Sequence, residues 1–181
     1  TRVLAGPWCT QNLADLGAEV IKIERPGAGD DTRGWGPPFL KDSQGQDTAE
    51  AAYYLSVNRN KRSVALDIAT PEGARLVREL AAQSDILIEN FKVGGLAKYG
   101  LDYASLSAEN PRLIYVSLKG FLSGPYKHRT ALDEVVQMMG GLAYINGGAD
   151  TPQRVAASVN DILGGTFGVV GALAALHDRH V

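Results

Sequence analysis

The sequence predicts an α/β protein built on a mostly parallel sheet with helices on its faces. Four short apolar runs at 20–24, 63–67, 85–89 and 113–118 have the pattern of strands, and helical patterns separate them. Strands that are apolar on both faces are typical of parallel sheets buried between layers of helices. The length of 181 residues suits one domain with a sizeable core. Together these observations favour a Rossmann-like architecture.

The helices between these strands carry recognisable start signals and stripes. Thr70 is a good N-cap, Pro71 suits the first helical position, and Glu72 adds an acidic first turn. The spacing after them predicts a helix over 71–81. A shorter helical pattern covers 11–16, and the last segment, 172–180, is also helical in pattern.

Polar segments follow three of the strands, at 24–32, 89–92 and 119–124. Ligands in such sheets bind outside the carboxyl ends of the strands, so a binding site is expected among these segments. Residues 26–49 also contain many glycines and prolines. A loop of this length is either functional, such as a lid, or a surface excursion, and the pattern leaves both readings open.

Composition excludes several classes of function. The net charge is −2 and no long basic stripe is present, which argues against a general nucleic-acid binder. The single cysteine, Cys9, allows no internal disulfide and no cysteine-based zinc site, and three histidines are few for a metal site. No signal peptide or continuous apolar run of membrane-spanning length is evident, so we expect no membrane partner. A reducing compartment, the cytoplasm or an organelle matrix, is expected.

Asp161 opens the helical pattern that runs to the end of the chain. A carboxylate in the first turn is stabilised by the helix dipole by roughly 0.3–1 kcal/mol, which would keep it ionised as a nucleophile must be. Gly164 and Gly165 would leave room for a substrate beside it. An aspartate at a helix start is also the usual N-cap, and spacing alone does not separate the two roles.

A second helix start carries Asp133 and Glu134, which could equally be partners of the helix dipole. Lys127, His128 and Arg129 precede it as a cationic cluster that could meet phosphates or lie in a solvated loop. A dinucleotide-binding glycine motif lies between the end of a strand and the start of a helix. The glycine sets near residues 94–100 and 164–171 lack this context, so a dinucleotide-dependent redox function is disfavoured.

Taken together, these stretches resemble the opening of the family III CoA-transferases, which include formyl-CoA, carnitine and bile-acid CoA-transferases and α-methylacyl-CoA racemase. The similarity is collinear over essentially the whole chain. It is carried by segments 5–11, 16–25, 29–35, 58–67, 70–73, 89–91, 110–112 and 119–121 and by the Asp161 helix.

The resemblance implies a large Rossmann-like domain that binds CoA, a smaller second domain, and an interlocked homodimer. Residues 1–181 correspond to the N-terminal part of the large domain, without its first strand. The second domain would lie outside this sequence.

The resemblance also assigns roles at three positions. Asp161 matches the family's nucleophile, which attacks an acyl-CoA thioester to form a mixed anhydride and then an aspartyl-CoA thioester. Tyr53 matches an active-site tyrosine of formyl-CoA transferase, and Asp133 falls where that enzyme has an active-site glutamate. No metal is implied. The substrates would be an acyl-CoA and a carboxylic acid.

Contacts with CoA carry over by position in the same way. Lys98 stands where a phosphate-binding arginine is common, and a lysine keeps the charge but loses the bidentate fork. Leu4 stands where formyl-CoA transferase has a glutamine, which argues against formyl or oxalate specificity. The implied CoA-binding residues are Val3, Leu4, Arg25, Leu66, Asp67, Ile68, Ala69, Asn90, Phe91, Lys92, Lys98, Arg129 and Thr130.

Leu132 bears on the type of reaction. The racemase branch has Gly-His-Asp where this chain has Ala131-Leu132-Asp133, and leucine cannot transfer a proton. CoA transfer between a donor and a small dicarboxylic or other acid is therefore the leading hypothesis. The alternatives are an acyl-CoA racemase or isomerase and a non-catalytic CoA-binding paralogue.

Overall fold

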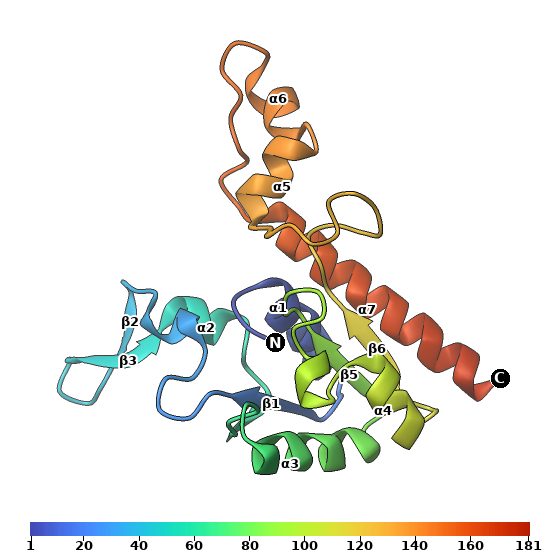
Figure 1. The fold of residues 1–181 in the computed structure, drawn as a ribbon. Helices are drawn as coiled ribbons and strands as arrows, with labels where there is room; N and C mark the ends of the chain where they lie inside the picture. Colours follow the sequence, from blue (N-terminus) through green and yellow to red (C-terminus); the bar gives the residue numbers. More distant parts are fainter.

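The computed structural model describes all residues from 1 to 181 and confirms an α/β fold (Figure 1). Its strands are β1 (Val20–Glu24), β2 (Phe39–Lys41), β3 (Asp47–Ala51), β4 (Lys61–Ala65), β5 (Ile86–Glu89) and β6 (Ile114–Ser117). Its α-helices are α1 (Ala5–Asp15), α2 (Ala52–Ser56), α3 (Pro71–Ala82), α4 (Tyr103–Glu109), α5 (Asp133–Met139), α6 (Leu142–Gly147) and α7 (Val159–His180). Short 3-10 turns are η1 (Asp31–Gly34) and η2 (Ala97–Tyr99).

The four predicted strands pair in parallel, as two separate pairs. β1 lies against β4 from Val20 opposite Lys61 to Glu24 opposite Ala65. β5 lies against β6 from Ile86 opposite Ile114 onward. β1 and β5 are not paired with each other, so the structure has two parallel ribbons where the sequence predicts one sheet. β4 also lies two residues earlier than the predicted 63–67.

The glycine- and proline-rich segment 26–49 is folded. It contains η1 and the antiparallel hairpin of β2 and β3, which stands apart from the parallel strands (Figure 1). Its base is held by buried ion pairs, from Lys22 to Asp30 at 2.8 Å and from Arg33 to Glu24 at 2.9 Å. Tyr54 and Ser63 donate further hydrogen bonds to Glu24. This segment is therefore an ordered excursion anchored to the end of β1.

α3 begins as the sequence predicts, because the Thr70 hydroxyl accepts a hydrogen bond from the Gly73 amide at 3.0 Å. The helix covers one side of the second strand pair. A core cluster joins it to η2, α4 and the start of β6, and consists of Ala81, Leu96, Leu101, Leu106 and Leu113.

α7 packs along α1, and two glycines make the approach close. A side chain at Gly165 would meet the Ala5 carbonyl oxygen at 2.6 Å, and one at Gly168 would meet the Cys9 sulfur at 3.1 Å. These glycines serve helix packing, as their place inside a helix indicates. α1 itself is longer than the predicted 11–16. It begins at Ala5 because Pro7 is tolerated in a first turn.

By length and composition alone, α7 could cross a membrane, with a mean hydropathy of 1.5 over its most apolar window. No continuous apolar run of that length is evident in the sequence, because Asp161 and glycines interrupt the pattern. Only 22% of the window is buried inside this chain. The helix packs on α1 and β6, as the core helix of a globular domain also does.

α5 and α6 form an arm that projects from the rest of the fold beyond the N-terminal end of α7, in orange in Figure 1. The first residues of α5 meet the first residues of α7 at the base of this arm. The meeting of these two helix starts positions the candidate active site.

Candidate active site

Asp161 is the third residue of α7 and is half-buried. Ser158 occupies the N-cap position and its side chain makes no capping bond. The Asp161 carboxylate accepts no hydrogen bond from the protein, so Asp161 is not the helix cap. Its oxygens are left to solvent or a ligand.

Asp133, at the start of α5, caps α7 in place of a local residue. Its Oδ1 accepts hydrogen bonds from the amides of Asn160 at 2.8 Å and Asp161 at 3.2 Å. The first amides of a helix have no partner within the helix, so a carboxylate from a neighbouring helix satisfies two of them here. The side chain is 8% exposed. The two acidic residues that the sequence singles out, Asp133 and Asp161, are thus brought together.

Burial, and then the negative charge of Asp133, raise the pKa of Asp161 to about 6. The group is therefore mostly ionised at neutral pH and more basic than an exposed aspartate. A carboxylate that is ionised, weakly solvated and free of protein donors is a competent nucleophile. No three His, Cys, Asp or Glu side chains lie close enough to share a metal ion.

Tyr53, on α2, lies within the field of the same carboxylates. Burial raises the pKa of its phenol, and the charges of Asp161, Asp30 and Asp133 raise it further. Its ring packs edge-on against Trp35, with centroids 5.6 Å apart. All three predicted catalytic residues therefore belong to one locality, where Tyr53 is neutral and remains a hydrogen-bond donor.

Sequence reasoning missed two residues of this locality. Trp35 reaches Tyr53 from the segment 26–49, and no local pattern indicated the contact. Gln137 is completely buried behind Asp133 and donates to its Oδ2. The one available signal was spacing, because Gln137 follows Asp133 by four residues and so shares its helix face.

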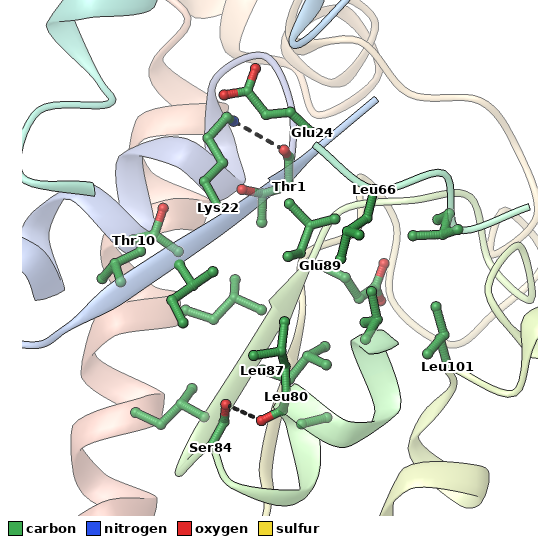
Figure 2. Close-up of a pocket in the computed structure, with 18 of the residues that line it drawn as sticks. Thr1, Thr10, Lys22, Glu24, Leu66, Leu80, Ser84, Leu87, Glu89 and Leu101 are labelled. Carbon is green, nitrogen blue, oxygen red and sulfur yellow. Dashed lines mark hydrogen bonds between the residues drawn. The ribbon is translucent and has the colours of Figure 1, made fainter. Parts of the chain in front are cut away.

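A groove of about 800 Å³ lies between β1 and β5, and Figure 2 shows its lining residues. The Lys22 ammonium group at its edge donates to the carbonyl oxygen of Thr1 at 3.2 Å. Every residue of β1 and of β5 lines the groove. Five of the predicted CoA-binding residues line the groove, namely Arg25, Leu66, Asp67, Ile68 and Phe91.

Three other predicted contacts cluster where the chain enters α1. Val3 has a left-handed backbone with φ of 63°, and its amide donates to Asp30 at 3.3 Å. Leu4 is buried at the helix start. The Asn90 side chain accepts from the Arg2 amide at 2.9 Å and donates to the Arg2 carbonyl at 2.7 Å. The ends of β1 and β5 and the α1 entry are thereby tied together.

The predicted cationic contacts are exposed and lie on separate segments. Arg25 makes a loose ion pair with Asp31 at 3.5 Å. Lys98 lies over its neighbour Tyr99, and Arg129 lies 5.0 Å from the Tyr126 ring. Ala69, Lys92 and Thr130 are exposed as well. The structure does not gather these residues into one pocket, and their role in CoA binding stays a prediction.

The comparison with known families decides the classification. The family model of CoA-transferase family III matches residues 1–181. The chain belongs to CoA-transferase family III. Among the relatives in this family, a succinate–glutarate CoA-transferase of Agrobacterium fabrum is 52% identical over 177 residues. That alignment covers 97% of this chain and 44% of the relative.

Two further comparisons give similar results. A succinyl-CoA:glutarate CoA-transferase of Mus musculus is 47% identical over 99% of this chain and 40% of its own length. The crystal structure of a CAIB/BAIF family protein from Brucella suis superposes with a TM-score of 0.92 at 50% identity, over 99% of this chain and 47% of that one. The chain therefore spans less than half the length of the relatives it matches.

Proposed function

We propose that the protein containing this chain is a CoA-transferase that moves CoA from an acyl-CoA donor to a small dicarboxylic acid, with Asp161 as nucleophile. The observation that carries the proposal is the state of the Asp161 carboxylate. It is half-buried, its pKa is raised to about 6, and no protein group donates to it, while its backbone is fixed by Asp133. An aspartate that served only as a helix cap would instead accept hydrogen bonds from the helix amides through its own carboxylate.

The proposed chemistry needs neither a redox step nor a net proton transfer. An Asp161 oxygen attacks the thioester carbon, the C–S bond breaks, and CoA leaves as thiolate with an acyl-aspartyl anhydride formed. The thiolate then attacks the Asp161 carbonyl carbon, which releases the donor acid and forms an aspartyl-CoA thioester. The acceptor carboxylate repeats these two steps in reverse order, so Asp161 returns as a free carboxylate.

The acceptor class is proposed from the names of relatives. Proteins 42–52% identical to this chain are described as CoA-transferases of succinyl-CoA or succinate with glutarate, D-citramalate or mesaconate. Their common feature is a short dicarboxylic acid. We expect the whole protein to use succinyl-CoA as donor and an acid of this class as acceptor.

The racemase alternative lacks an acid–base group at the place where that branch has one. Leu132 occupies the N-cap position of α5, is 60% exposed, and makes no capping bond. A leucine there cannot remove or return an α-proton. A non-catalytic paralogue would have no need for the free carboxylate of Asp161.

We also propose that residues 1–181 form part of a CoA-binding domain, with the thirteen predicted contacts near the nucleotide. The unpaired edges of β1 and β5 face one groove. One further parallel strand there would join the two pairs into a single sheet in the order β4, β1, new strand, β5, β6. With the new strand counted as the first, that is the order 3-2-1-4-5 of a Rossmann-like sheet, whose binding crevice lies at the switch point beside strand 1.

A homodimer is proposed as well. α7 exposes large apolar side chains along one side, with Leu163 53% exposed, Phe167 70% and Val170 56%. Exposed apolar surface of this extent marks a contact with further protein. Light scattering on the whole protein tests the dimer, and a monomer at micromolar concentration would contradict it.

The experiment for the proposed function is a donor–acceptor screen of the whole protein, with succinyl-CoA against a panel of mono- and dicarboxylic acids. CoA transfer to a dicarboxylic acid, abolished in the Asp161→Asn variant, is the expected result. Exchange of an α-proton with solvent deuterium without transfer to any acid would favour the racemase alternative.

A further inference from the structure

We propose that Gln137 is a positioning residue for the nucleophile: it orients the Asp133 carboxylate, and Asp133 in turn fixes the start of α7 and the place of Asp161. The inference rests on the proposed function, since it concerns the same aspartate. It assigns Asp133 a role in positioning, in place of direct contact with substrate.

The Gln137 side chain is hydrogen-bonded both to Asp133 and to the loop that precedes α7. Its side chain is fully buried, with 0% exposure. Its Nε2 donates to Asp133 Oδ2 and to the carbonyl oxygens of Val155 at 3.4 Å and Ala157 at 3.2 Å. Its Oε1 accepts from the Val155 amide at 2.7 Å. One side chain thus joins α5 to the loop that leads into α7.

Both carboxylate oxygens of Asp133 already accept hydrogen bonds from the protein. Oδ1 is taken by the amides of Asn160 and Asp161, and Oδ2 by Gln137. A buried carboxylate whose two oxygens are both held in this way is poorly placed for proton transfer or for direct contact with substrate. It can still act on Asp161, through the hydrogen bond to the backbone and through its charge.

A glutamine meets the demands of this position in a way that no close substitute does. The position requires a donor toward a carboxylate and two carbonyls, together with an acceptor toward an amide. A primary amide supplies both, whereas glutamate lacks the donor when ionised and methionine lacks both. Because the amide is neutral, the negative charge of Asp133 stays uncompensated and acts on Asp161.

The charged and titratable groups around this cluster are few. Asp133 and Glu134 lie on α5, Arg154 pairs with Glu134 at 3.0 Å, Asp161 faces the cluster from α7, and the Tyr53 phenol lies nearby on α2. Arg154 also donates to the Ala156 carbonyl, within the same loop. The one cation beside position 137 is Arg154, whose Nε donates to the Val155 carbonyl oxygen that Gln137 also contacts. A second carboxyl group at position 137 would therefore contact Asp133 while the nearby Arg154 is already paired with Glu134.

The first test is Gln137→Met in the whole protein, with succinyl-CoA as donor. The rate of Asp161 acylation should fall about 10- to 100-fold, because a small misplacement of a nucleophile has effects of that order. The KM for acyl-CoA should stay within about threefold, since no substrate contact is removed. Circular dichroism checks that the variant is folded.

Asn146→Ala is the matched control. Asn146, on α6, donates to the carbonyl oxygens of Gln153 and Arg154 and so ties down the same loop without touching Asp133. If general loosening of the loop were the cause, both variants would lose acylation alike. Our proposal requires the control to stay within about threefold of the wild type.

The second variant, Gln137→Glu, keeps the size of the side chain and adds a pH readout. The introduced carboxyl group can donate to Asp133 when it is protonated, as the amide does, whereas it repels Asp133 when it is ionised. The variant should therefore be most active at mildly acidic pH and lose activity as the pH rises, where the wild type keeps it. This readout remains informative if Gln137→Met does not fold.

Wild-type acylation rates in both Gln137 variants would overturn the positioning role, as would an unchanged pH profile in Gln137→Glu. Failure of the proposed function looks different. In that case the wild type itself forms no covalent adduct on Asp161 with succinyl-CoA.

Discussion

The amide of Asp161 donates a hydrogen bond to the Asp133 carboxylate at 3.2 Å, and this contact joins the starts of two helices that lie 28 residues apart. It places a buried negative charge beside the candidate nucleophile. Burial of Asp161, and then this charge, raise the pKa of its carboxyl group, whose own oxygens accept no hydrogen bond from the protein. A change of charge at Asp133 is therefore expected to alter the titration of Asp161.

The rate of Asp161 acylation should fall below about pH 6, because only the ionised carboxylate attacks and its pKa is raised to about 6. Asp133→Asn removes the neighbouring negative charge, so this fall in rate should move to lower pH. Single-turnover acylation rates against pH measure this. Glu134→Gln, an exposed position already paired with Arg154, serves as control and should leave the fall in rate at the same pH.

Asp161→Asn should stabilise the folded protein at neutral pH. The pKa of Asp161 is raised on folding from 3.8 to about 6, so the ionised form is penalised in the folded state above that pH. A rise in pKa from 3.8 to about 6 corresponds to at most about 3 kcal/mol of unfolding free energy, and the difference between variant and wild type should vanish as the pH falls below the unfolded-state pKa. Urea unfolding at two pH values measures it, and equal stability at neutral pH would contradict the prediction.

Arg33→Met should destabilise the segment 26–49 and the end of β1. Burial opposes ionisation of Glu24, but hydrogen bonds from Arg33, Ser63 and Tyr54 hold its pKa well below the usual range. Removing the cation leaves a buried carboxylate partly unpaired, at a cost of about 3 kcal/mol. Lys41→Met breaks an exposed ion pair with Asp47 and should cost less than about 1 kcal/mol.

The same Glu24 cluster has a defined dependence on pH. Because the pKa of Glu24 is lowered on folding, its contribution to stability is present above the unfolded-state pKa of 4.5 and is lost as the pH falls further. The difference in unfolding free energy between wild type and Arg33→Met should therefore narrow in acid. If this difference in unfolding free energy does not change with pH, ionisation of Glu24 is not responsible for it.

The groove between β1 and β5 should be filled by a strand in the whole protein. The amides of Ile21, Ile23, Ile86 and Ile88 alternate with those bonded to β4 and β6, so they face the groove. Hydrogen exchange at these amides should be as slow as in the paired strands. Rapid exchange there would contradict the proposed sheet order.

Much of the fold could be predicted from local sequence because its signals are local. The α3 start at Thr70 and the apolar run of β5 are examples. The sequence pattern places β4 too late because Asp67 resembles the end of a strand, whereas its side chain accepts from the Ala69 amide and turns the chain there. The start of α1 was missed because Gly6 and Pro7 usually interrupt a helix.

The candidate site was predictable only in part, for a physical reason. Asp161 lies at a helix start, which a sequence pattern can reveal, but its free carboxylate depends on Asp133 from another helix. The roles of Gln137 and Trp35 arise from contacts across distant segments, which no local spacing encodes. The separation of β1 and β5 into different strand pairs could not be predicted either, because local spacing does not encode which strands are neighbours.

The most direct test of the central claim is trapping of the acyl-enzyme. The whole protein is incubated with succinyl-CoA, treated with hydroxylamine, digested and analysed by mass spectrometry, with Asp161→Asn as control. We predict a hydroxamate on Asp161 in the wild type and none in the variant. An active enzyme with an unmodified Asp161, or with the modification on another residue, would contradict it.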